Sequence, residues 1–170
     1  MQRQRTRKDE NKDTKKTSRK KWHPKYGTSK LEEDFAKEFL DKLGIKYSYQ
    51  FEAKDISRFY DFACFIDGNP NNLSIGNILI IEVDGSYYHS DPRLVKEEEM
   101  SPMQKKNKMV DKIKDRWAFE HGIPLMRIWE KDIRENPKKV MKDLKDRFYI
   151  EDKKKTLLEN KKKRHVNKIK

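Results

Sequence analysis

Apolar positions recur at helical spacing from Leu31 to Leu43, and this periodicity predicts the first helix of the chain. Ser29 and Glu32 have the spacing of a capping box, in which each side chain binds the backbone of the other residue. Gly44 is suited to end the helix, because glycine readily adopts the left-handed conformation that follows many helices. These signals define one helix at the start of the predicted fold.

Three strand-like segments follow within a short length of chain. Ile45–Ala53 alternates aromatic and polar residues, Phe59–Ile66 is mostly apolar, and Ile78–Asp84 begins as an apolar, β-branched run. A dense turn signal at 67–72 separates the second segment from the third. Because the connections are short, we expect these three strands to form an antiparallel meander.

The second half of the chain predicts a helix that returns to the sheet. Residues 92–103 lack periodicity and are expected to form a loop or an irregular helix. A long helix from Gln104 to Glu120 should lead through a right-handed crossover to a fourth strand at Pro124–Trp129, parallel to the third, and a last helix should begin near Pro137. The inner face of the long helix should carry Val110, Ile113, Trp117 and His121. The expected fold is α/β, with a three-stranded antiparallel meander and a parallel fourth strand flanked by helices.

Charge is distributed unevenly along the chain and divides it into three parts. Of the net charge of +13, residues 1–30 contribute +9 from twelve Lys or Arg and three Asp or Glu, and residues 151–170 contribute +6 from nine and three. The remaining middle part therefore has a net charge of −2. We expect a disordered basic arm at 1–28, a globular domain at 29–150 and a basic tail at 151–170 that is either helical or frayed.

Basic tails of this kind usually contact a polyanion. Nucleic acid is the first candidate, an anionic membrane surface is the second, and a solvated tail without a partner is the third interpretation. The tail residues expected to contact nucleic acid are Lys15, Lys16, Arg19, Lys20, Lys21, Lys161, Lys162, Lys163 and Arg164.

The sequence offers no membrane-spanning or secretory segment. No apolar run approaches the roughly 20 residues that a membrane span needs, and residues 2–21 lack the apolar centre of a signal peptide. We therefore expect no membrane part and no secretion. The single cysteine, Cys64, lies in a strand-like run and should be a core residue, and no Cys/His cluster has the spacing of a structural zinc site.

The third strand ends in an unusual set of polar residues. Glu82 and Asp84 are two positions apart, so they share one face of the strand. Gly85, two tyrosines and His89 follow. Because ionised carboxylates are rarely buried unless they are paired or metal-bound, these acids are candidates for a catalytic or metal site.

Three short stretches stand in the order found in one enzyme family: Tyr60–Ala63, Glu82–His89, and Asp111–Lys114 leading to Gly122–Trp129. They resemble the PD-(D/E)xK nuclease superfamily and, in detail, the very-short-patch repair (Vsr) endonucleases and their EDxHD homing-endonuclease relatives. The resemblance covers about residues 29–145. It implies a restriction-endonuclease-like core and metal-dependent hydrolysis of phosphodiester bonds in duplex DNA, as in a homing enzyme, a mismatch nickase or a nuclease of a mobile element or phage. It thereby also implies a cytoplasmic, nucleoid-associated protein of a bacterial or phage-infected cell.

The resemblance also implies roles for individual residues. Its catalytic positions fall on Glu32, Asp61, His89 and Asp111. The ligands implied for Mg²⁺ or Mn²⁺ are Asp61, the Val83 carbonyl, and Glu82 or Asp84. His89 would act as general base or acid, oriented by Asp111, while Glu32 would hold a metal-bound water or the substrate. Lys114 and Arg127 are either phosphate contacts or ordinary solvated side chains.

Some positions depart from the family pattern. Asp84 replaces the lysine that is usual in the superfamily, so the site is expected to lose a cation and gain an acid. With this change the sequence is compatible with the binding of either one metal ion or two. Tyr60 stands where proline is usual, and the zinc-binding cysteines and histidines of the Vsr enzymes have no counterpart. The alternative function is an inactive DNA- or RNA-binding protein with a degenerate nuclease fold. A double-strand cut would need a homodimer or two sequential nicks.

The candidate residues also have purely structural interpretations. Glu32 can serve only as the capping-box acid, and Asp61 can pair with Arg58. Asp111 can be an exposed helix acid, and His89 can be a loop histidine beside the two tyrosines. Only the positions of these side chains in the folded chain decide between the interpretations.

Overall fold

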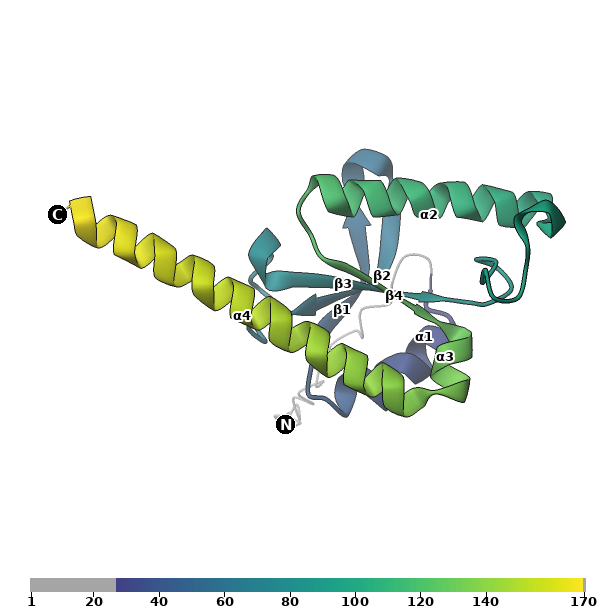
Figure 1. The fold of residues 1–170 in the computed structure, drawn as a ribbon, viewed down its shortest axis with the longest axis horizontal. Helices are drawn as coiled ribbons and strands as arrows, with labels where there is room; N and C mark the ends of the chain where they lie inside the picture. The colour runs from purple at the N-terminus through teal and green to yellow at the C-terminus, as the bar shows by residue number, and fades with distance from the viewer. Residues whose placement is uncertain (1–26, 170) are drawn as a thin grey trace, which may run out of the picture.

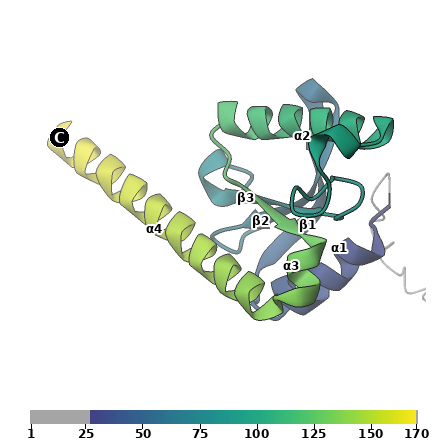
Figure 2. The same ribbon diagram turned by 45° about the vertical axis from the view of Figure 1, so that its right-hand side comes forward.

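A four-stranded sheet forms the centre of the computed structural model, which describes residues 27–169 and the side chains of residues 27–161 (Figure 1, Figure 2). The strands are β1 at Lys46–Ala53, β2 at Arg58–Phe65, β3 at Ile78–Asp84 and β4 at Leu125–Trp129. Their order in the sheet is β1-β2-β3-β4. The first three are antiparallel neighbours and β4 pairs parallel to β3, which confirms the predicted meander and parallel fourth strand.

Helices cover both faces of the sheet. They are α1 at Lys30–Phe35, which continues as the π-helix η1 at Ala36–Asp41, α2 at Pro102–Glu120, α3 at Glu130–Glu135 and α4 at Pro137–Ile169. Short 3₁₀ turns lie at η2 (Lys54–Ile56), η3 (Ile75–Asn77) and η4 (Glu97–Glu99). Figure 1 shows α2 on one side of the sheet and α1, α3 and α4 on the other. The structure is thus α/β, with a mixed sheet between two helical layers.

β3 is buried along its whole length and separates two hydrophobic clusters. Its odd-numbered residues pack with α1, η1 and the first half of α4. Its even-numbered residues Ile78 and Ile80 pack beneath α2 with Trp117. Because alternate side chains of a strand point to opposite faces, Glu82 and Asp84 continue the face that α2 covers.

The side chains of β1 and β2 change faces part-way along these strands. Tyr49 packs in the cluster under α1 and Phe51 packs in the cluster under α2, and Gln50 between them has a φ of 57°. On β2 the same change occurs at Asp61. Phe62 after it packs in the cluster under α1, whereas Tyr60 before it packs in the cluster under α2. A left-handed φ is uncommon for a residue other than glycine and marks local strain. The change of faces turns the far end of the β1–β2 hairpin toward α2 and leaves Asp61 at the bend.

The inner face of α2 differs from the predicted one. The helix begins at Pro102, before the predicted start, with Ser101 as N-cap. Trp117 is buried as predicted, but Ile113 is 44% exposed, whereas Lys114 is only 7% exposed. The prediction that Ile113 belongs to the inner face is therefore wrong. The physical reason is that α2 meets the buried acids of β3 at this point, where a cation is more stable than an apolar side chain.

The C-terminal part differs from the prediction in one element, because the short helix α3 was not predicted. α4 runs without interruption past residue 150 to Ile169, in agreement with the helical alternative for the basic tail. Figure 1 shows the second half of α4 projecting beyond the sheet, and its Leu157 and Leu158 are 61% and 56% exposed. Among the described residues, no helix is long and apolar enough to cross a membrane.

Part of the predicted basic surface lies outside the described residues. This holds for residues 1–26 of the arm, including Lys15, Lys16, Arg19, Lys20 and Lys21, and for the side chains of Lys162, Lys163 and Arg164. Lys161 is described and is exposed on α4. Cys64 is fully buried in the core, as predicted.

The first half of α4 should provide most of what this helix contributes to stability. Leu144 is fully buried against the sheet, so Leu144→Ala should lower the free energy of unfolding by about 2–5 kcal/mol. Leu157→Ala, on the projecting half, should change it by less than about 0.5 kcal/mol. Urea denaturation followed by circular dichroism measures both changes, and equal effects would contradict this division of α4.

Candidate active site

The end of β3 buries two carboxylates, and each forms an ion pair. Glu82 and Asp84 are 2% and 1% exposed. The Lys114 ammonium group from α2 contacts Glu82 Oε1. Arg127 Nη1 from β4 donates to both oxygens of Asp84 at 2.8 and 2.9 Å. A buried charge without a partner is strongly destabilising, so these two cations allow β3 to end in acids inside the protein.

Lys114 and Arg127 thus lie in an environment that the sequence did not indicate. Lys114 is buried, and Arg127 also contacts Asp111 and Asp115, so neither is an ordinary solvated side chain. The expectation that Asp84 leaves the site short of a cation is wrong, because Lys114 brings one from a neighbouring helix. Lys114 follows Asp111 by three residues and therefore shares its helix face, and this spacing was the signal available in the sequence.

Asp61 lies where the ladder between β2 and β3 ends. Its Oδ2 accepts a hydrogen bond of 2.8 Å from the Val83 N–H, in place of a backbone carbonyl of β2. The N–H and C=O of one strand residue point to the same side, so the Val83 carbonyl is also directed toward Asp61. Arg58 does not take Asp61 as its hydrogen-bond acceptor; its Nη1 donates to the Ser57 carbonyl. Burial, followed by the charge of Glu32, raises the pKa of Asp61 to about 6.

Glu32 caps the first helix and also belongs to the acidic group around Asp61. Its Oε1 accepts hydrogen bonds from Ser29, at 2.6 Å from the hydroxyl and 3.3 Å from the backbone N–H, which confirms the predicted capping box. The other oxygen, Oε2, is buried and has no hydrogen-bond partner among the described residues. A buried carboxylate oxygen without a partner costs free energy, so this atom is suited to a ligand that brings positive charge.

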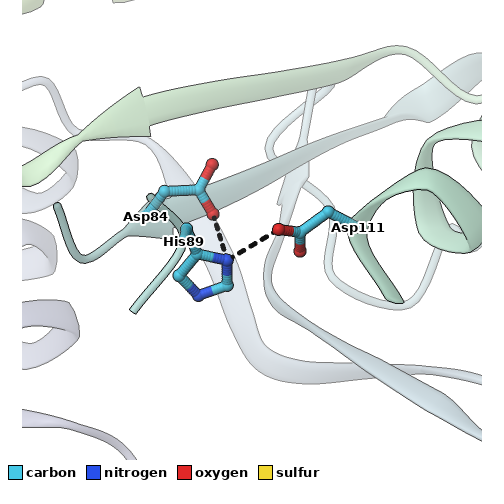
Figure 3. Close-up of side chains that lie close together, drawn as sticks. All are labelled: Asp84, His89 and Asp111. Carbon is cyan, nitrogen blue, oxygen red and sulfur yellow. Dashed lines mark hydrogen bonds and ion pairs between the residues drawn. The ribbon is translucent and has the colours of Figure 1, made fainter. Parts of the chain in front are cut away.

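His89 lies in the turn after β3 and forms a pair with Asp111 (Figure 3). Its Nδ1 is 2.9 Å from Asp111 Oδ2 and 3.6 Å from Asp84 Oδ1. Burial lowers the pKa of His89, but the hydrogen bond with Asp111 and the charge of Asp84 outweigh burial, so the net pKa is raised. For Asp111, burial is outweighed by the hydrogen bond to His89, and its pKa is lowered. The structure therefore places Asp111 on His89 rather than in solvent.

Two amide side chains of α2 fix the turn that carries His89. Gln104 Nε2 donates to the Tyr87 carbonyl at 2.7 Å, and Asn107 Nδ2 donates to the Tyr88 carbonyl at 3.0 Å. These residues were not singled out from the sequence, because amide side chains on a helix carry no distinctive pattern. Gln104 and Asn107 position His89 relative to Asp111, because all three of these α2 side chains contact the same turn.

Two groups of side chains offer possible ligands for a divalent cation, one around His89 and one around Asp61. Asp84, His89 and Asp111 each offer one ligand atom, and these atoms lie within 4.8 Å of one another. Their oxygens and nitrogen, however, are already joined to one another and to Arg127, whose charge opposes a metal. Asp61 instead has no ion-pair partner among the described residues. The charges of neighbouring acids raise its pKa although the charge of Lys114 lowers it, and a metal would relieve the repulsion between the acids.

The acidic group around Asp61 fits a hard cation better than the group around His89. Carboxylate and backbone carbonyl oxygens are the ligands that Mg²⁺ prefers. Asp61, the unpartnered oxygen of Glu32 and the Val83 carbonyl supply such atoms, and the neighbouring charge of Asp61 raises the pKa of buried Glu82 further than burial already does. Asp61 is therefore the residue best suited to be the centre of a metal site, whereas Asp84 lies beside His89.

Comparison of the chain with protein-family models, with curated proteins and with solved structures finds no match. The assignment of chemistry accordingly depends on the geometry described above.

The ion pair of Lys114 and Glu82 should be strongly coupled. Lys114→Met leaves Glu82 buried without a cation, so the free energy of unfolding should fall by about 3–5 kcal/mol. The double variant Glu82→Gln/Lys114→Met should regain most of that loss, and Lys112→Met, on the exposed side of the same helix, should change it by less than about 0.5 kcal/mol. A double-mutant cycle, with unfolding in urea, measures the coupling between the two residues. If the effects of the two single substitutions simply add in the double variant, the ion pair is contradicted.

Asp61 should make stability fall as the pH rises. Its pKa is about 6 in the folded protein and about 3.9 in an unfolded chain. Between these values the folded state binds more protons than the unfolded state, so the free energy of unfolding decreases with increasing pH. The loss reaches at most about 3 kcal/mol above pH 7. Asp61→Asn keeps an oxygen for the Val83 N–H and should remove this loss, as measured by urea unfolding at about pH 4 and pH 8.

Divalent metal should offset the same loss. Mn²⁺ should raise the melting temperature of the wild type more at pH 8, where Asp61 is ionised, than at about pH 4, and it should not raise that of Asp61→Asn. Asp34→Asn, which changes an exposed acid of α1, should respond to metal as the wild type does. A wild-type protein without any response to metal at pH 8 would refute Asp61 as a ligand.

Proposed function

We propose that this chain is a metal-dependent endonuclease that hydrolyses phosphodiester bonds of duplex DNA, with Mg²⁺ or Mn²⁺ as cofactor. The observation that carries the proposal is the meeting of four elements at the end of β3. Asp61 from β2, Glu32 from α1 and the residues of β3 supply carboxylate and carbonyl oxygens, and the pair of His89 and Asp111 lies beside them. A restriction-endonuclease-like fold, which the order of helix, meander, helix and strand supports, is part of the same proposal.

The metal would be held by Asp61, the Val83 carbonyl and Glu32, the last either directly or through water. When bound, a divalent cation neutralises the charge that develops on the phosphate and makes a bound water a stronger nucleophile. The protein contributes a ligand group that is already assembled, because the hydrogen bond between Asp61 and the Val83 N–H keeps that carboxylate at the end of β3.

His89 would move a proton during cleavage. Since Nδ1 is hydrogen-bonded to Asp111, Nε2 is the nitrogen left for an attacking water or a leaving oxygen. The neighbouring acids raise the pKa of the imidazole, which makes it a stronger base near neutral pH. Asp111 would act through His89, as a positioning residue that keeps the ring oriented and stabilises its charged form.

Lys114 and Arg127 would support the site rather than touch the DNA. Lys114 compensates the charge of Glu82, and Arg127 compensates Asp84 behind His89. These ion pairs replace the phosphate contacts that the sequence indicated for both residues. Duplex DNA as partner, and with it an association with the nucleoid, follows from the proposed reaction and from the net charge of +13.

Supercoiled plasmid incubated with the protein and Mg²⁺ or Mn²⁺ should be nicked, and a chelator should stop the reaction. Asp61→Ala and His89→Ala should lower the nicking rate by about 100-fold or more, while DNA binding measured by gel shift is retained. His121→Ala should keep wild-type activity, because His121 stacks on Trp117 at the other end of α2.

Two results would decide against the enzyme. Binding without nicking in either metal would favour the inactive DNA- or RNA-binding protein with a degenerate nuclease fold. Full nicking by both Asp61→Ala and His89→Ala would instead show that the reaction occurs elsewhere in the chain.

A further inference from the structure

The outward face of α2 is a continuous basic surface. Its members follow the helical repeat and are all exposed to solvent: Lys105, Lys106, Met109, Lys112, Ile113 and Arg116. Met109 and Ile113 are 66% and 44% exposed and lie between the four cations. We call these six residues the outer face of α2. Between Lys105 and Arg116 this face carries four positive charges and no acid, whereas both signs are normally mixed on a protein surface.

Of the three acids of α2, two are turned away from this face, and the third, Glu120, continues it at its C-terminal end, four residues after Arg116. Asp111 is bonded to His89, and Asp115 is bonded to Arg127. Glu97 of η4 forms its ion pair with Lys108, and the charges of Lys112 and Lys105 further lower its pKa. Within residues 27–161, the four cations of the outer face have no ion-pair partner. Their side chains are therefore not held by an acid and can contact an anion.

The outer face borders the candidate active site. A cavity of about 280 Å³ opens beside the His89 turn, and its walls contain Asp84, His89 and Asp111 together with Lys108 and Lys112 of α2. Lys112 thus belongs both to the outer face and to the cavity wall. The projecting half of α4, in contrast, leads away from α2 and from this end of β3 (Figure 1).

We propose that the outer face of α2 is the surface on which duplex DNA lies, with its four cations on backbone phosphates. The choice of DNA as occupant rests on the proposed function; the existence of a polyanion surface rests on the charges alone. From Lys105 to Arg116 the helix rises by about 16 Å, which spans several phosphates of a duplex. Lysine and arginine contacts to phosphate provide affinity without reading sequence, so this surface sets the register of the duplex at the site.

An anionic membrane surface fits the same face less well. Helices that lie in a membrane interface have a broad apolar face rich in Trp, Phe and Leu. The outer face has two apolar side chains among four cations, and the apolar face of α2 is occupied by its packing on the sheet. The location beside a group of residues suited to phosphodiester chemistry favours DNA.

The test compares two variants of the full chain that each lose four positive charges. The first is Lys105→Gln/Lys106→Gln/Lys112→Gln/Arg116→Gln. The control is Lys37→Gln/Lys46→Gln/Lys138→Gln/Lys145→Gln, whose exposed lysines lie on η1, β1 and α4. The Kd for a short random-sequence duplex is measured by fluorescence anisotropy with a chelator present, at salt concentrations from about 50 to 200 mM. Circular dichroism confirms that both variants fold.

The outer-face variant should bind at least about tenfold more weakly, and its plot of log K against log salt should become shallower by up to about 3.6, or about 0.9 for each phosphate that the protein no longer neutralises. The control should lose less than one unit of slope. At saturating DNA the triple variant Lys105→Gln/Lys106→Gln/Arg116→Gln, which keeps Lys112 of the cavity wall, should still nick plasmid in Mn²⁺, because no residue that lines the site is changed.

Equal losses of affinity in the two variants, or none in the outer-face variant, would overturn the proposed surface. So would a loss of binding to phosphatidylserine-containing vesicles without a loss of DNA binding. If the outer-face variant alone loses DNA binding while the wild type nicks nothing in either metal, the DNA surface stands and the proposed enzyme function fails.

Discussion

The burial of two carboxylates at the end of β3 is the constraint on which the rest of the structure depends. Inside a protein an unpaired charge is far less stable than in water, so Glu82 and Asp84 require cations within contact distance. Lys114 on α2 and Arg127 on β4 provide them. The two ion pairs therefore tie the crossover helix and the fourth strand to the centre of the sheet.

The same helix that compensates the acids also completes the candidate site. α2 carries Lys114 on one turn and Asp111 on the preceding turn, and it holds the His89 turn through Gln104 and Asn107. Each of these contacts needs α2 at one distance from β3. Compensation of charge and orientation of His89 are thus consequences of a single packing arrangement, and a change in one is expected to disturb the other.

Asp61 and Glu32 have no ion-pair partner among the described residues. Asp61 lies at the bend of β2, the charge of Glu32 contributes to its raised pKa, and one oxygen of Glu32 has no hydrogen-bond partner among the described residues. Such a group destabilises the folded chain until something positive binds, and sites of this kind are commonly functional. The strained backbone at Gln50 lies on the neighbouring strand, at the same bend.

Local properties of the chain determined the strands, the capped first helix, the parallel fourth strand and the paired acids Glu82 and Asp84, because periodicity, turn residues and capping depend on neighbours in sequence. The resemblance to a nuclease family, rather than a local property, indicated Asp61, His89 and Asp111 as catalytic candidates. Only the tertiary structure decided that Lys114 rather than Ile113 is buried, that side chains change faces at Asp61, and which cation meets which acid. The physical reason is that an ion pair or a bend is selected by the total charge and packing around it, and those contributions come from segments far apart in the sequence.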